Sequence, residues 1–246
     1  MVKFSSMESV KAIFWIYWMA FSRSIALLTK NWGIIFAPLA YSLILSVAEA
    51  LLAPFGLIGG ILLTAIAAAC TSSGLHLLDN ITRGGKVALR DFATGFTVYI
   101  WEILTIGFIL WIPMTLLSRA AITTPEGPLI VLGVRIILYV VLNVIPELIY
   151  QSRLSGVALL SASYEFIVAN WIEWFLPNVL IAAVGFLLLD GLGSVAVYLP
   201  LFLQSFCIAS IFGLFLTFLM IFRGVLFSDL SSTTRRSRIY RYRAQA

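Results

Sequence analysis

Long apolar runs separated by short polar stretches make up most of the chain. A helix needs roughly 20 consecutive apolar residues to cross the hydrocarbon core of a bilayer, where it satisfies its own backbone hydrogen bonds. The pattern predicts a membrane helix bundle of about six spans, at residues 33–53, 56–78, 96–118, 128–149, 171–189 and 192–222. The last run exceeds the length of a span, so we expect Pro200 to divide it into a short interfacial piece and the crossing helix.

The connections between the runs are short. Pro54-Phe55 separates the first two runs and Asp190-Gly191 separates the last two, so tight hairpins are predicted at both places. Residues 119–127 join the third run to the fourth and contain Thr-Thr-Pro-Glu-Gly-Pro, which is typical of a turn. The expected fold is therefore all-α, with little chain outside the membrane.

Two segments outside the spans are expected to form amphipathic helices at the membrane surface. Residues 12–21 (AIFWIYWMAF) are apolar and aromatic but too short to cross, which predicts an interfacial helix, with a seventh span as the alternative. The basic connector at residues 79–93 is long enough for a short helix after Gly84-Gly85.

The composition excludes other classes of fold. Of the 246 residues, 61% are hydrophobic and 11% are charged, whereas a typical soluble domain is about 25% charged. So few polar residues cannot cover a surface that faces water, and so hydrophobic a chain does not stay disordered. We expect one transmembrane domain over residues 1–230, followed by a basic cytoplasmic tail over residues 231–246.

The positions of the basic residues predict an orientation. If the N-terminus is cytoplasmic, fourteen of the sixteen Lys and Arg residues fall on the cytoplasmic side, and Arg119 and Arg135 fall on the other. Cytoplasmic loops are enriched in Lys and Arg. The pattern therefore indicates a multi-pass protein of the cytoplasmic (inner) membrane, with both termini in the cytoplasm.

One segment of the sequence occurs twice. Residues 22–38 (SRSIALLTKNWGIIFAP) and 161–177 (SASYEFIVANWIEWFLP) share Ser-x-Ser, Asn-Trp and Phe-x-Pro at a constant offset of 139. The Asn is expected to cap a new helix, the Trp to mark the membrane interface, and the Pro to lie in the first turns. The residues concerned are Asn31, Trp32 and Pro38 in the first copy, and Asn170, Trp171 and Pro177 in the second.

Four predicted spans separate the starts of the two copies, so both have the same orientation and the repeat is parallel. Inverted repeats are the form common in secondary transporters. Two interpretations of the repeat remain open. It either forms two matched interfacial gates around a central path, or it is an old duplication kept for packing and insertion.

Few residues within the spans could carry chemistry. Glu49 and Arg135 both lie within roughly 6–11 Å of the outer boundary. They could form a buried ion pair, or each could reach the interface separately. Four neutral polar residues could line a narrow path or bond neighbouring helices together. They are Thr71, Asn143, Gln204 and Ser205.

The residues that most reactions need are scarce. No acid and no histidine clearly occupies the middle of a span, which disfavours proton-driven transport. The chain has one His and two Cys without CxxC spacing, and it contains no GxSxG, Walker or HExxH motif. We therefore expect no metal, no cofactor and no enzymatic activity.

The basic tail alternates arginine with tyrosine. Its arginines are Arg235, Arg236, Arg238, Arg241 and Arg243. Near an anionic leaflet each could contribute about 1 kcal/mol to membrane binding. The tail is expected either to dock on a cytoplasmic partner or to act as a flexible topology anchor, and nucleic-acid binding is disfavoured.

The interfacial segment, the Asn-Trp and Phe-x-Pro span and the Gly-Gly basic connector resemble poorly characterised bacterial membrane families. One of these is the membrane domain attached to some glycerophosphodiester phosphodiesterases. The resemblance covers residues 22–120 and 150–225, without a phosphodiesterase catalytic domain, and it implies a scaffold or a transport-associated module. The function expected is a non-catalytic membrane subunit that packs with other membrane proteins, and the alternative is a permease or channel for a small or lipidic substrate.

Overall fold

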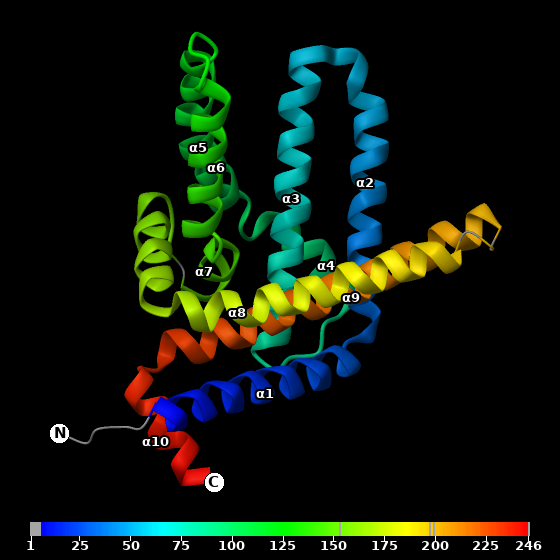
Figure 1. Ribbon diagram of the computed structural model, residues 1–246. Helices are drawn as coiled ribbons and strands as arrows, with labels where there is room; N and C mark the ends of the chain where they lie inside the picture. The colour runs from blue at the N-terminus through cyan, green and yellow to red at the C-terminus, as the bar shows by residue number, and fades with distance from the viewer. Residues whose placement is uncertain (1–5, 153, 197, 199, 246) are drawn as a thin grey trace. The chain divides into compact units, whose positions relative to one another are not determined.

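The computed structural model describes residues 6–152, 154–196, 198 and 200–245 (Figure 1). The regular structure in these residues is entirely helical, as predicted. The helices are α1 (Ser6–Lys30), α2 (Ala37–Leu52), α3 (Gly56–Thr82), α4 (Leu89–Thr94), α5 (Ile100–Ala121), α6 (Gly127–Val141), α7 (Ile145–Ser152), α8 (Val157–Ala196), α9 (Leu201–Ser232) and α10 (Arg235–Gln245). Short 3-10 helices lie at Trp32–Phe36 (η1), Ala53–Phe55 (η2) and Gly95–Thr97 (η3).

Six segments of the described chain are long and apolar enough to cross a membrane, in agreement with the predicted membrane class. They are Lys11–Lys30, Trp32–Thr82, Ile100–Ala121, Gly127–Ser152, Val157–Gly193 and Phe206–Ser232. These six segments differ from the six predicted spans in two ways. Trp32–Thr82 contains both of the first two predicted spans, and Lys11–Lys30 includes the segment for which an interfacial helix is predicted.

The N-terminal helix is longer than the ten apolar residues suggested. α1 has 25 residues and continues through Ser22, Arg23 and Ser24. The Ser24 hydroxyl donates to the carbonyl oxygen of Ala20 (2.6 Å), so its polar group is satisfied inside the helix. α1 is therefore long enough to be a membrane span, which is the alternative to an interfacial helix.

The predicted hairpins have different outcomes. α2 and α3 form a hairpin at η2, where Gly56 takes a φ of +54°, so the expected turn at Pro54-Phe55 is confirmed. The turn expected at Asp190-Gly191 is wrong, because α8 continues to Ala196. One glycine costs a helix only about 1 kcal/mol. The break lies instead before α9, whose N-cap Pro200 has an extended ψ of 142°.

The fourth predicted span is interrupted. α6 ends at Val141 and α7 begins at Ile145, so residues 128–149 are not one helix. Pro146 explains the interruption, because it lacks the N–H that would donate to the carbonyl oxygen four residues earlier, at Leu142, in a continuous helix. In the basic connector the expected short helix is present as α4.

The chain divides into two compact units. Within the described residues the first comprises 6–43, 80–87 and 170–245, and the second comprises 44–79 and 88–169. The second unit contains the α5–α6 hairpin, which turns between Ala121 and Gly127 as predicted. In the same unit, buried Ser72 and Ser73 of α3 donate to the carbonyl oxygens of Gly95 and Phe92, both at 2.7 Å.

The first unit is built around α9. α1 lies along α9, where the rings of Phe21 and Phe218 meet edge to face at 5.4 Å. α10 packs against α1, with Trp15 and Tyr242 at 6.3 Å. The residues expected to form a separate tail therefore belong to this unit.

A close approach of α9 to η1 requires glycine. A Cβ added at Gly213 would overlap the carbonyl oxygen of Ile35. Replacing Gly213 with alanine is expected to cost about 1–3 kcal/mol, because the two backbones must move apart. The apparent melting temperature in detergent, followed by circular dichroism, should fall. Gly191→Ala is the control, because its added Cβ meets open space, and an equal fall in both variants would contradict the explanation.

Candidate functional site

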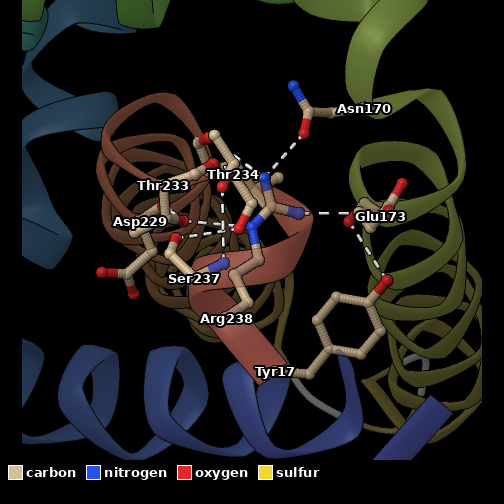
Figure 2. A network of polar contacts seen from close by, with 9 residues as sticks. Tyr17, Asn170, Glu173, Asp229, Thr233, Thr234, Ser237 and Arg238 are labelled. Atoms are coloured by element: carbon tan, nitrogen blue, oxygen red, sulfur yellow. Dashed lines mark hydrogen bonds and ion pairs between the residues drawn. The ribbon is translucent and has the colours of Figure 1, made fainter. Parts of the chain in front are cut away.

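Buried polar side chains gather in the first unit, at a place that the sequence did not indicate (Figure 2). We call this cluster the Arg238 network, and its members are Tyr17, Asn170, Glu173, Thr233 and Arg238. Arg238 is 4% exposed and Glu173 is 2% exposed. Charged side chains are almost never buried to this extent unless they are paired.

The end of α9 positions Arg238. Thr233 ends α9 in an extended conformation (φ −134°, ψ 143°), and its hydroxyl donates to the carbonyl oxygen of Asp229. α10 then begins at Arg235, and Arg238 reaches back to α9. Its Nη2 donates to the carbonyl oxygens of Leu230 (3.2 Å) and Thr233 (3.0 Å). A cation is favourable there, because the last carbonyls of a helix lack helical partners and carry partial negative charge.

The same guanidinium connects α10 to α8. Arg238 Nη2 donates to Asn170 Oδ1 at 2.8 Å, and Nη1 lies 3.9 Å from Glu173 Oε1. From α1, the Tyr17 hydroxyl donates to the backbone oxygen of Glu173 at 3.2 Å. Figure 2 shows Asn170 and Glu173 beside the guanidinium, and the Tyr17 hydroxyl directed at Glu173. These contacts join α1, α8, α9 and α10, so the network is suited to holding these helices together.

One member of the Arg238 network, Asn170, lies at a break in α8. Asn170 has non-helical backbone angles (φ −132°, ψ 22°) inside the helix. Its side-chain oxygen accepts from Arg238, so α10 is fastened at the point where α8 bends.

Asn31, the matching residue of the first repeat copy, occupies a similar position. Its backbone is also non-helical (φ −122°, ψ 35°), between α1 and η1. Its Oδ1 accepts from the Val87 N–H at 2.9 Å, and its Nδ2 donates to the carbonyl oxygens of Leu27 (3.0 Å) and Gly85 (3.4 Å). Asn31 makes no side-chain capping bond to η1. The expected capping role is therefore wrong, and the side chain instead fastens the connector after α3.

The two copies expose corresponding residues to a similar degree. Trp32 is 67% exposed and Trp171 is 58% exposed, while both asparagines are buried. The second serine of each Ser-x-Ser, Ser24 and Ser163, is also fully buried. The prolines differ, because Pro38 is half-buried and Pro177 is buried.

The ion pair suggested by the sequence does not form. Glu49 and Arg135 are both exposed, and no ion pair joins them within the described residues. Both lie on lipid-accessible helices, α2 and α6, from which each long side chain can reach an interface separately.

The residues of the predicted polar path lie on different elements of the chain. Thr71 is exposed, and its hydroxyl donates to Ala67 of its own helix at 2.9 Å. Asn143 lies in the break between α6 and α7, and Gln204 lies half-buried on α9. The side chain of Ser205 lies outside the described residues.

The arginines of the C-terminal segment are not equivalent. Arg238 is buried, whereas Arg241 and Arg243 are exposed. The side chains of Arg235 and Arg236 lie outside the described residues. Residues 235–245 form α10, which packs against α1. Ile239 beside Arg238 is also buried, so an apolar position within the basic run was the available signal.

Groups suited to metal binding are not found in the described chain, where no three His, Cys, Asp or Glu side chains come together. Cys70 and Cys207 are free thiols. No protein-family model, curated protein or solved structure matches this chain.

Proposed function

We propose that the chain is a non-catalytic integral membrane subunit or scaffold, which binds neighbouring membrane proteins through one face of α3. This α3 face consists of Gly56, Gly60 and Thr64, which are all exposed. The observation that carries the proposal is that a Cβ added at Gly56 or Gly60 would have no heavy atom within 4 Å. No described residue of this chain uses the close approach that these two glycines permit.

Small residues favour helix association in a bilayer, because they let two backbones approach closely. Thr64 adds no unsatisfied polar group to the α3 face, since its hydroxyl donates to the Gly60 carbonyl at 2.8 Å. The most apolar 18-residue window of Trp32–Thr82 is only 6% buried inside the described chain. Lipid or another protein must cover this surface, and the α3 face suits a helix.

The buried polar residues favour a subunit over the alternative, a permease or channel. Arg238, Asn170 and Glu173 bond one another or helix ends. Such groups stabilise a packed unit and do not line a route for a substrate. The proposed scaffold role also agrees with what the family resemblance implies.

We further propose a parallel internal repeat in a bacterial cytoplasmic membrane, with both termini in the cytoplasm. The non-helical asparagines and exposed tryptophans of the two copies support a common origin. The distribution of basic residues supports the orientation if α1 lies in the interface. If α1 crosses the membrane, the N-terminus lies on the other side.

The experiment is purification of the full chain from its native membrane in mild detergent, with quantitative mass spectrometry of proteins that co-purify in fixed ratio. Gly60→Leu should remove such a partner, because an isobutyl group separates the helices by more than a close contact allows. Gly107→Leu on α5 is the matched control, since this glycine is also exposed and open. We expect it to retain the partner.

Two outcomes would reject the subunit. One is a chain that purifies without partners and gives substrate-dependent flux in liposomes. The other is a partner that Gly60→Leu and Gly107→Leu release equally, because binding would then not depend on the α3 face.

A further inference from the structure

Four basic residues gather around the connector that follows α3. Arg23 Nη2 donates to the carbonyl oxygen of Thr82 at 3.4 Å, and Lys30 Nζ donates to that of Gly84 at 2.9 Å. Arg83 and Lys86 belong to the connector itself, and all four side chains are exposed. Arg23 and Lys30 of α1 therefore join the two basic residues of the connector.

The connector is held in a defined conformation. Gly84 takes a φ of +85°, which favours glycine, and Gly85 N–H donates to the Asn80 carbonyl at 2.9 Å. Asn31 fastens the other end, because it bonds both Val87 N–H and the Gly85 carbonyl. The cations are thus presented by a fixed loop, which lowers the entropy cost of binding a ligand.

The charge of this surface is strongly positive. Residues 80–90 (NITRGGKVALR) contain three basic residues and no acid, and Asp79 and Asp91 flank them. Arg23 and Lys30 of α1 add two more cations. Asp229 lies within electrostatic range of Arg23, so Lys30 and Lys86 are the cations on which the positive charge of this surface mainly depends. Lysine and arginine in such a group bind phosphate, by point charge and by bidentate hydrogen bonding respectively.

Neighbouring residues indicate that the phosphate belongs to a lipid. Trp32 follows Lys30 by two residues and is 67% exposed, and Leu89 follows Lys86 by three and is 93% exposed. Exposed tryptophan is typical of the headgroup level of a membrane. Cations so close to Trp32 lie at the depth of lipid phosphates, where a soluble phosphate compound would have to compete with the headgroups.

We infer that Lys30, Arg83 and Lys86, assisted by Arg23, bind the phosphate of an anionic phospholipid headgroup. We call this the connector site. The second repeat copy has no equivalent, because Ala169 stands where Lys30 stands in the first, and the arginine that contacts its asparagine is buried. The inference does not depend on the subunit function.

The test is native mass spectrometry of the purified full chain with equal amounts of phosphatidylglycerol and phosphatidylcholine. A basic residue near an anionic surface is worth about fivefold in binding. Lys30→Gln with Lys86→Gln should therefore lower the ratio of phosphatidylglycerol to phosphatidylcholine bound by roughly 25-fold. The control is Arg119→Gln with Arg135→Gln, which removes the same charge from exposed positions elsewhere, and the ratio should stay near that of the wild type.

Lys86→Gln alone separates binding from folding. The Lys86 side chain makes no hydrogen bond or ion pair to any described residue, so its loss should leave the connector intact and lower the ratio about fivefold. An unchanged ratio in both connector variants, or an equal loss in the control, would overturn the connector site. Displacement of phosphatidylglycerol by millimolar inorganic phosphate would overturn its assignment to a lipid, and retention would support it.

Discussion

Replacing Arg238 with methionine is expected to lower the free energy of unfolding by about 3–5 kcal/mol, because it removes one partner of a buried ion pair. The Glu173 carboxylate would lose the guanidinium at 3.9 Å, and Asn170 would lose the donor at 2.8 Å. Methionine keeps much of the length and the apolar volume of the side chain. The change therefore tests the charge and the hydrogen bonds more than the packing.

The measurement is the apparent melting temperature in detergent, which should fall by roughly 6–20 °C for a chain of this size. Arg241→Met is the matched control, because Arg241 lies on the same helix and is exposed. Its effect should stay within about 0.5 kcal/mol.

A double variant identifies the cause of the loss. Glu173→Gln combined with Arg238→Met removes the buried carboxylate together with its cation, so it should be more stable than Arg238→Met alone. If the double variant is less stable than Arg238→Met, the ion pair is not what Arg238 contributes.

Replacing Trp174 with alanine should have an effect of similar size, about 3–5 kcal/mol. Trp174 of α8 is 0% exposed and packs against α9 in the first unit. The Phe227 ring lies 6.5 Å from it edge to face, and the Arg223 guanidinium carbon lies 5.0 Å from its ring centroid. Alanine would leave a cavity and remove the aromatic face from the cation.

Trp171 provides the control, because it lies three residues earlier in α8 and is 58% exposed. Trp171→Ala should change the free energy of unfolding by no more than about 0.5 kcal/mol. Both variants are followed by circular dichroism during heating. Equal losses would mean that the side chains contribute through membrane anchoring and not through burial.

Much of the helical layout could be predicted from the sequence, because lipid imposes a simple rule. The hairpin at Pro54-Phe55 and the turn at residues 119–127 follow from the lengths of the apolar runs and from turn-forming residues. The errors occurred where one residue opposed a long apolar pattern. Pro146 interrupts an apolar run, whereas Asp190-Gly191 fails to interrupt one.

The Arg238 network could not be predicted in the same way. Five arginines share residues 235–243, and their order does not reveal which one turns inward. Burial of Arg238 depends on Glu173 and Asn170, which are more than 60 residues away in the chain. Glu49 and Arg135 show the opposite case, because complementary charge at similar expected depth did not bring the side chains together.

The fastening of Asn170 by Arg238 also has a consequence for the order in which the protein forms. Every described residue of the second unit is synthesised before Asn170, so that unit can fold while the ribosome is still at work. The first unit draws on α1, on the connector and on α10. Arg238, which bonds Asn170 at the bend in α8, is made 68 residues later. This contact and the ion pair with Glu173 can therefore form only after α10 has been synthesised.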